Sequence, residues 1–485
     1  MPERKAHLSL GDVTYLVSTL VIGVSAMLAL CALAGLVLGD GSAVALALAA
    51  GVGLLVGGAG RFLTHVPESI NFREAFVMVT FSWVAVAVIG ALPYLFSGVV
   101  REPAEALFES MSGFTTTGST ILTDIEGVLP GILLWRSLTQ WLGGMGFIVL
   151  GVAVLPYLGV GGMQLFRLEA PGPTTDRLRP RIRETARLLW VVYLALTGLL
   201  VALFRFGGMS GFDALNHALT TMPTGGFSTR NDSMAAFSAA IQWITIVFMF
   251  LAGTSFTLHY RVISRGPRAY WRDTEWRLYA GIVLIGTLLV TILTAGNGQA
   301  AEPLVRDAMF QVVSIVTTTG YGTADFALWM PGAQIVLFLL FFLGGMAGST
   351  AGGMKMIRVL LVLKQAWLEV RKQLHPRAVI VPKVGGKPIQ EHIMMNVLGF
   401  VLIYFMLFGV GAFLMSTLGL SMPAAAGAAA TAISNVGPGL AELGPAENFS
   451  AVPWQGHLIL TFLMMVGRLE IYTVVLLFHP GLWRR

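Results

Sequence analysis

The sequence is poor in cysteine and in charge, and these two shortages exclude several classes of protein. Its single cysteine, Cys31, permits no intramolecular disulfide and argues against a metal–thiolate cluster. Only 12% of its 485 residues are Asp, Glu, Lys or Arg, so little sequence remains for a soluble catalytic domain. No Walker A, Rossmann, HExxH or GxSxG motif occurs, and the eight histidines have no metal-ligand spacing. We therefore expect no enzyme activity and no nucleotide site in this chain.

Long hydrophobic runs take the place of the missing polar sequence. The chain is 55% hydrophobic with a mean hydropathy of +0.76, which is typical of polytopic membrane proteins. A spanning helix needs roughly 20 apolar residues, and the run at 15–38 lacks the cleavage site of a signal peptide. We expect spans at about 13–38, 43–61, 74–97, 130–157, 186–205, 237–262, 277–295, 331–370 (interrupted), 391–417 and 453–479.

The charged residues divide between the two sides of these spans. If the spans alternate from a cytoplasmic N-terminus, most of the 31 Lys and Arg residues fall in cytoplasmic loops, with clusters at 177–187 and 261–277. This positive-inside bias predicts cytoplasmic termini and contacts with membrane lipids rather than with nucleic acid. The opposite side is acidic, and a negative mouth concentrates cations. Its acidic residues include Glu102, Glu105, Glu109, Asp213, Glu302, Asp307 and Glu442.

Four short amphiphilic stretches between the spans are copies of one unit. They contain ALFESMSGFTTTGST (106–120), ALNHALTTMPTGGFS (214–228), IVTTTGYGTADF (315–326) and AAGAAATAISNVGPG (425–439). Alignment on Gly118, Gly226, Gly320 and Gly437, here called the aligned glycines, places an alanine twelve residues earlier in every copy. A hydroxyl residue stands six earlier, an apolar residue four earlier, and Thr116, Thr224, Thr318 or Asn435 two earlier. Internal repetition of this kind is the signature of duplicated structural units.

Each copy lies between two spans and is too short to cross a bilayer, which is typical of a re-entrant segment. We therefore predict an all-α polytopic membrane protein with four span–pore-helix–filter–span repeats in a pseudo-fourfold arrangement round one pore, plus two extra N-terminal transmembrane helices. The predicted units are 1–69 (the N-terminal helices), 70–160, 161–265, 266–375 and 376–485.

The residue types at the aligned glycines suit a dehydrated monovalent cation. Backbone carbonyls from four strands can replace the water of such an ion, and glycine adopts the required backbone angles at low cost. Only the third copy has the full Thr-x-Gly-Tyr-Gly pattern of a potassium-channel filter. Ordinary Gly/Thr turns are the alternative for any one copy, but four aligned copies argue against it. The expected ligands are Thr116, Thr117, Gly118, Thr224, Gly225, Gly226, Thr318, Thr319, Gly320, Tyr321, Asn435, Val436 and Gly437.

The span that follows the third copy is too long for one crossing, because its roughly 40 residues would form a helix of about 60 Å. Glycines at 343–356 predict a break and a flexible loop able to block the ion path. A tight helix-crossing patch of small residues is the alternative. Arg468, deep in the last span, is either an electrostatic barrier at this loop or a structural residue. The expected gate residues are Gly344, Gly345, Gly348, Ser349, Gly352, Gly353, Lys355 and Arg468.

Over nearly its whole length the chain resembles the Trk/Ktr/HKT superfamily of potassium transporters. The resemblance implies potassium selectivity, because a glycine fills the key filter position of all four repeats, and an intramembrane gating loop with Arg468 as its barrier. It also implies a homodimer with one pore per subunit in the bacterial cytoplasmic membrane. The implied cytosolic partner is a nucleotide-binding regulatory ring of the TrkA type, for which the basic stretches 158–185 and 371–390 are the expected docking surfaces.

The expected function is therefore potassium uptake by selective, gated permeation, with K⁺ as the transported ion. The alternative is a proton- or sodium-coupled potassium symporter. Such a symporter needs a carboxylate in the ion path, and Glu470 is the only strong option that the sequence offers.

Overall fold

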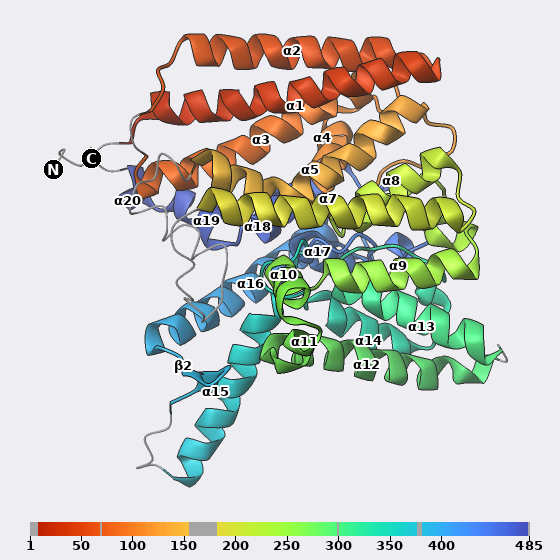
Figure 1. The fold of residues 1–485 in the computed structure, drawn as a ribbon, viewed down its shortest axis with the longest axis vertical. Helices are drawn as coiled ribbons and strands as arrows, with labels where there is room; N and C mark the ends of the chain where they lie inside the picture. The colour runs from red at the N-terminus through yellow and green to blue at the C-terminus, as the bar shows by residue number, and fades with distance from the viewer. Residues whose placement is uncertain (1–7, 68–69, 155–181, 298–299, 376–380, 484–485) are drawn as a thin grey trace.

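The computed structural model describes residues 8–67, 70–154, 182–297, 300–375 and 381–483, and excludes the side chains of residues 72, 147–154, 182–186 and 387. Most of the predicted docking stretch 158–185 therefore lies outside the described residues. The described chain is mainly helical (Figure 1). Its first ten helices are α1 (Leu10–Leu38), α2 (Ser42–Phe62), α3 (Phe72–Phe96), α4 (Pro103–Phe114), α5 (Pro130–Val154), α7 (Ile182–Phe206), α8 (Gly211–Thr221), α9 (Ala239–Ala252), α10 (Phe256–Arg265) and α11 (Arg268–Arg272).

The second half of the chain has the same character, with one small β-hairpin. Its helices are α12 (Thr274–Thr294), α13 (Ala301–Val316), α14 (Pro331–Phe341), α15 (Met356–Leu374), α16 (Glu391–Thr417), α17 (Met422–Ser434), α18 (Trp454–Arg468), α19 (Tyr472–Val475) and α20 (Pro480–Trp483). The hairpin pairs β1 (Lys383–Val384) with β2 (Lys387–Pro388) in antiparallel fashion. Short 3₁₀ turns occur at Ser233–Ala236, Ala295–Asn297, Phe326–Leu328, Ala441–Leu443 and Leu476–Phe478.

The predicted spans correspond closely to these helices. Within the described residues, α1, α2, α3, α7, α12 and α16 are each long and apolar enough to cross a membrane, and two bent helix pairs raise the number from six to eight. The remaining two predicted spans correspond to α5 and to α14 with α15. Large apolar side chains on these helices face outward, such as Leu55 (75% exposed) and Leu402 (72%). An apolar exterior of this extent indicates a lipid-facing surface.

Three of the predicted spans break, whereas the sequence predicted a break in only one. The interruption between α14 and α15 is the predicted one, and the residues between Phe341 and Met356 form no helix. In addition, α9 and α10 meet at 96°, and α18 meets the helical turns after it at 113°. Hydropathy missed these two bends because the mean hydropathy stays high across each of them although the backbone turns there. Glu470, for example, has a φ of 56°.

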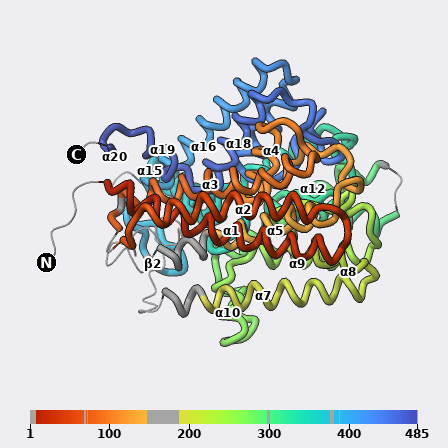
Figure 2. Tube along the Cα trace, turned by 90° about the horizontal axis from the view of Figure 1, so that it is seen from above, coloured from red at the N-terminus to blue at the C-terminus, as the bar shows by residue number. Residues whose placement is uncertain are grey.

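The helices form a layered bundle (Figures 1 and 2). The α1–α2 pair lies on one face, while α7 and α16 lie on opposite sides of the bundle in Figure 2. Asp40, between α1 and α2, accepts hydrogen bonds from Ser42 and from the backbone N–H of Gly131 (2.5 Å), which connects this pair to the start of α5. Although burial alone would raise the pKa of Asp40, these hydrogen bonds keep it below its ordinary value. Helix α15 and the β-hairpin project from the body in Figure 1.

Candidate ion-binding site at the four glycine segments

The short helices α4, α8, α13 and α17 all end in the same backbone motif. The residue two before each aligned glycine is left-handed: φ is 55° for Thr116, 57° for Thr224, 56° for Thr318 and 56° for Asn435. The next residue donates its N–H to the carbonyl five residues earlier, in the pairs Thr117–Ser112 (2.9 Å), Gly225–Thr220 (2.9 Å), Thr319–Ser314 (2.8 Å) and Val436–Thr431 (3.0 Å). This is a Schellman motif, which normally has glycine at the left-handed position.

Threonine is energetically unfavourable at that left-handed position. A β-branched residue at positive φ is an outlier, and backbone strain of this kind costs about 1–3 kcal/mol. Three of the four copies nevertheless have threonine there and the fourth has asparagine, all with fully buried side chains. Glycine would relieve this strain but would supply no side-chain oxygen at this level.

The four segments are arranged in a closed cycle. Each aligned glycine has a positive φ (86° for Gly118, 77° for Gly226, 82° for Gly320, 115° for Gly437), and its missing side chain leaves room for a carbonyl of the next segment. A Cβ atom on Gly118 would meet the carbonyl oxygen of Gly225, and one on Gly226 would meet that of Thr319. A Cβ atom on Gly320 would meet the carbonyl oxygen of Val436, and one on Gly437 would meet that of Thr117. In each case the partner is the residue just before the next aligned glycine, so the contacts run from the first copy to the fourth and back to the first.

The hydroxyl residues six positions before the aligned glycines form hydrogen bonds to the segments. Ser112 donates to the carbonyl of Ser119 (2.6 Å), and Ser314 donates to that of Tyr321 (2.7 Å), in each case the residue after the aligned glycine. In the fourth copy, Thr431 accepts from the N–H of Gly437 (2.8 Å). In the second copy, the hydroxyl of Thr220 instead contacts the phenol of Tyr321 from the third copy. These hydroxyls thus hold the first, third and fourth segments locally, and the hydroxyl of the second copy contacts the third segment.

Two of the side-chain oxygens at the start of the segments have no hydrogen-bond partner in the described part of the chain. Thr116 Oγ1 and Asn435 Oδ1 are buried, and no described residue donates a hydrogen bond to either. An unsatisfied buried polar atom costs about 1–3 kcal/mol. The amide nitrogen of Asn435 is satisfied, since it donates to Thr117 Oγ1 (3.0 Å) and to the carbonyl of Met464 (2.9 Å). Free oxygens beside backbone carbonyls are the donor set that a dehydrated alkali cation requires.

The interruption between α14 and α15 lies directly against the starts of three segments. The N–H of Gly352 donates to Thr318 Oγ1 (2.6 Å), and Thr350 donates to the carbonyl of Met222 (2.9 Å). Gly352 also packs against the carbonyl of Ser434, because a Cβ atom there would approach it to 2.6 Å. The chain between Phe341 and Met356 is therefore a loop and not a continuous helix, and it contacts the second, third and fourth segments.

The predicted cations Arg468 and Lys355 both bind backbone carbonyls of this region. Arg468 donates to the carbonyl of Thr350 in the loop (2.8 Å) and to that of Gly143 on α5 (3.0 Å). The ammonium of Lys355 donates to the carbonyl of Ala351 within the loop itself. Arg468 therefore connects the end of α18, the loop and α5, which makes it a tether as well as a positive charge.

The sequence analysis did not predict the contacts that Glu275 and Arg358 make at and beside the loop. One carboxylate oxygen of Glu275 accepts the N–H groups of Ala347 (2.7 Å), inside the loop, and of Ile357 (3.0 Å), just after it. Arg358 forms an ion pair with Glu470, and its guanidinium carbon lies 3.8 Å from the ring centre of Phe400. Glu275, in the first turn of α12, carries only the sequence signal of an acid that favours a helix N-terminus.

Two acidic residues of the predicted outer side are buried and do not contribute an exposed charge. Glu109 is paired with Arg136, and Asp213 with Arg230. Gln140 on α5, which no motif indicated, binds both sides of the second segment. It donates to the carbonyl of Gly225 (2.7 Å) and accepts the N–H of Phe227 (3.1 Å).

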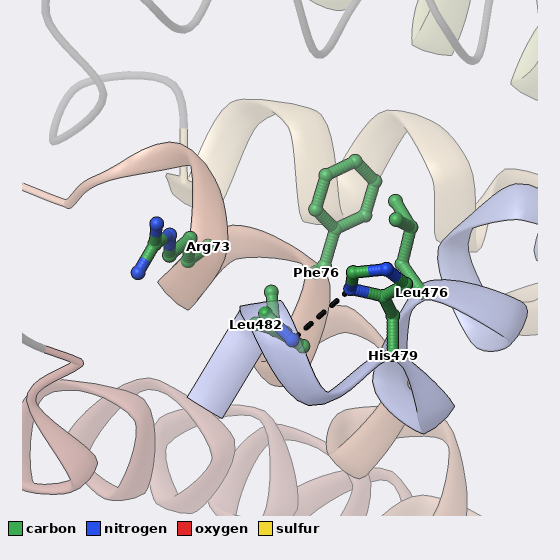
Figure 3. Close-up of a pocket in the computed structure, with 6 residues that line it drawn as sticks. Arg73, Phe76, Leu476, His479 and Leu482 are labelled. Atoms are coloured by element: carbon green, nitrogen blue, oxygen red, sulfur yellow. Dashed lines mark hydrogen bonds between the residues drawn. The ribbon is translucent and has the colours of Figure 1, made fainter. Parts of the chain in front are cut away.

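A separate cavity of about 270 Å³ lies away from the glycine segments (Figure 3). It is formed by Arg73 and Phe76 of α3 with Leu476, His479, Gly481 and Leu482 near the end of the chain. The N–H of Gly481 donates to His479 Nδ1 (3.0 Å), and this hydrogen bond shapes the turn beside it. None of its lining residues belongs to the glycine segments or the loop.

An apolar helical bundle with a buried ring of backbone and hydroxyl oxygens defines a polytopic membrane transport protein. The family model for TrkH, described as a cation transport protein, matches residues 47–484. The chain therefore belongs to the TrkH family of cation transport proteins.

Individual relatives agree with this assignment. The Trk system potassium uptake protein TrkH of Salmonella typhimurium is 38% identical over 97% of this chain and 99% of its own. The protein of the same name from Halomonas elongata is 40% identical over 91% of this chain and 92% of its own. The crystal structure of the potassium transporter TrkH from Vibrio parahaemolyticus superposes with a TM-score of 0.89 at 35% identity, covering 98% of this chain and 100% of that one.

Proposed function

We propose that this chain takes up potassium across the bacterial cytoplasmic membrane by selective, gated permeation through one pore. The observation that carries the proposal is the closed cycle in which each aligned glycine packs on the carbonyl before the next one. Such a cycle surrounds a single axis with oxygens from four segments, which is what a dehydrated potassium ion needs. The names of the relatives, potassium uptake proteins of the Trk system, favour the same ion.

In this proposal the pore is built from four repeats within the boundaries predicted above, with α1 and α2 outside them. The ion ligands are the thirteen predicted residues of the glycine segments, Tyr321 included. The strained Thr116, Thr224 and Thr318 and the amide of Asn435 supply the first layer of oxygens, and the carbonyls that follow supply the others. The unpartnered Thr116 Oγ1 and Asn435 Oδ1 support this role, because a cation would satisfy both.

The loop between α14 and α15 is the proposed gate, in the closed position. It blocks the starts of three segments, and Arg468 holds it there through the carbonyl of Thr350 while placing a positive charge next to the ion path. The symporter alternative loses support, since Glu470, its strongest candidate carboxylate in the sequence, is paired with Arg358. The basic loops favour cytoplasmic termini.

The first test is ion flux into proteoliposomes that contain the purified chain. We expect uptake of K⁺ and Rb⁺ to exceed that of Na⁺ and Li⁺, because the oxygen cage fits the larger ions. Under voltage clamp, the reversal potential should follow the potassium Nernst slope at every pH and sodium concentration. A reversal potential that moves with pH or with sodium would support coupled transport instead, and equal uptake of all four ions would refute the proposal.

We further propose a homodimer that binds a cytosolic nucleotide-binding ring of the TrkA type. The proposed docking surface consists of the basic end of the projecting helix α15 and the described residues that follow it within 371–390. Purified chain should retain such a ring protein in a pull-down, and Lys372→Glu with Arg371→Glu should weaken retention at least about tenfold, as loss of charge pairs at an interface does. Arg61→Glu on α2 is the matched control. Retention that is absent with and without nucleotide contradicts the docking proposal.

A further inference from the structure

Glu109 and Arg136 form a buried ion pair to which the proposed pathway assigns no role. Glu109 lies on α4 and Arg136 on α5; their side chains are 0% and 2% exposed, and Arg136 Nε lies 2.7 Å from Glu109 Oε1. Burying two charges costs several kcal/mol per ion, and packed apolar residues often serve stability better. Stability alone is therefore a weak reason for such a pair beside the glycine segments.

The pair binds the first two segments at the same level. The Glu109 carboxylate accepts the hydroxyl of Thr120 (3.0 Å) and the N–H of Ile121 (3.0 Å). Arg136 donates to the carbonyl of Ser228 (2.9 Å). Thr120 and Ser228 each stand two residues after an aligned glycine, so one ion pair connects equivalent positions of the two copies.

Arg136 is also fixed in orientation. Its guanidinium carbon lies 3.5 Å from the ring centre of Phe227, the residue after the second aligned glycine. Stacking on the ring and the forked geometry of the guanidinium leave little freedom to the Ser228 contact. A movement of α4 or α5 is therefore transmitted to both segments together.

The corresponding position is filled differently in the other copies. Nine residues before the aligned glycine, the third copy has Gln311, which donates to the carbonyl of Ala324 (3.0 Å), and the fourth has the apolar Ala428. In the second copy the position is His217, whose Nε2 shares a hydrogen bond with the hydroxyl of Ser228 (2.9 Å). The Glu109–Arg136 ion pair thus contacts the first two segments, which also lack the second glycine of the channel pattern.

We propose that Glu109 and Arg136 are positioning residues that set potassium-over-sodium discrimination by holding the first two segments at a fixed separation. Discrimination requires that the oxygen cage not contract around the smaller ion. An ion pair held by four contacts resists this contraction from outside the cage. The inference rests on the proposed function, since it concerns the selectivity of the same pore.

The test compares K⁺ and Na⁺ uptake by folded variants in proteoliposomes. Glu109→Gln alone leaves Arg136 buried without a counter-charge and is expected to reduce folding yield. The double variant Glu109→Gln with Arg136→Met removes both charges and should fold. Arg136→Lys keeps the charge but lacks the fork that reaches both Glu109 and Ser228. We expect each of these last two to lower the K⁺/Na⁺ uptake ratio at least about tenfold, the equivalent of roughly 1.4 kcal/mol.

The control is Arg306→Gln, which breaks an ion pair with Glu302 inside α13 that touches no glycine segment. It should keep the wild-type ratio. A wild-type K⁺/Na⁺ uptake ratio in either folded variant of the Glu109–Arg136 pair would overturn the inference while leaving the proposed function intact. A wild-type protein without potassium preference would overturn the proposed function, and the inference with it.

Discussion

Gly118→Ser and Gly320→Ser should each reduce potassium-over-sodium selectivity at least about tenfold, a loss of roughly 1.4 kcal/mol in discrimination. The reason is geometric. Gly118 has a φ of 86° and Gly320 one of 82°, where an L-residue is strained by about 1–3 kcal/mol. In both positions a new Cβ atom would also overlap a carbonyl oxygen of the next segment. That carbonyl must move, and the oxygen cage changes size with it.

The matched control is Gly322→Ser, which replaces the second glycine of the full channel pattern. Gly322 has no positive φ, and a Cβ atom there would meet only Pro445 at 3.6 Å and Gln311 at 3.9 Å, which are ordinary contacts. The first two copies already have Thr120 and Ser228 at this position. We therefore expect a nearly wild-type uptake ratio from Gly322→Ser. Equal damage from all three substitutions would mean that the contacts of the aligned glycines do not determine selectivity.

This contrast reverses what the motif alone suggests. A search for the channel pattern treats both glycines of the third copy as essential and ignores the first copy. The backbone angles instead group Gly118 with Gly320 and separate Gly322 from both. Alignment of the four copies predicted this grouping, since the columns before each glycine are local in sequence and survive divergence. Those columns fix where each short helix ends and where its left-handed residue stands.

Contacts between distant residues could not be predicted in this way. Glu275 joins Ala347 and Ile357, Gln140 binds Gly225, and none of these pairs has a sequence motif. The sequence placed Glu109 among the acidic residues of the outer side, but it gave no indication that this side chain is buried. Its burial depends on Arg136, 27 residues away on another helix. The bends at α9–α10 and α18–α19 were missed for a related reason, as hydropathy reports composition and not backbone angles.

Arg468→Ala should raise potassium flux at least about tenfold in the absence of any regulatory partner. The guanidinium donates to the carbonyls of Thr350 and Gly143, and a charged hydrogen bond contributes about 1.5–3 kcal/mol. Loss of both contacts frees the loop from α18 and α5. Loss of the charge also removes a repulsion from the ion path. Both changes act in the same direction, so the open state gains population and conducts better. Flux into proteoliposomes measures the outcome.

Arg468→Lys separates the two contributions. Lysine retains the positive charge but lacks the fork that spans two carbonyls. If repulsion dominates, Arg468→Lys will conduct like the wild type; if the tether dominates, it will conduct like Arg468→Ala. Glu275→Gln tests the tether from the other side, because a neutral amide oxygen accepts the N–H groups of Ala347 and Ile357 less strongly than a carboxylate does. Flux unchanged in Arg468→Ala would exclude Arg468 as either barrier or tether, and the other contacts of the loop, among them those of Gly352, Thr350 and Ala347, would then hold the gate.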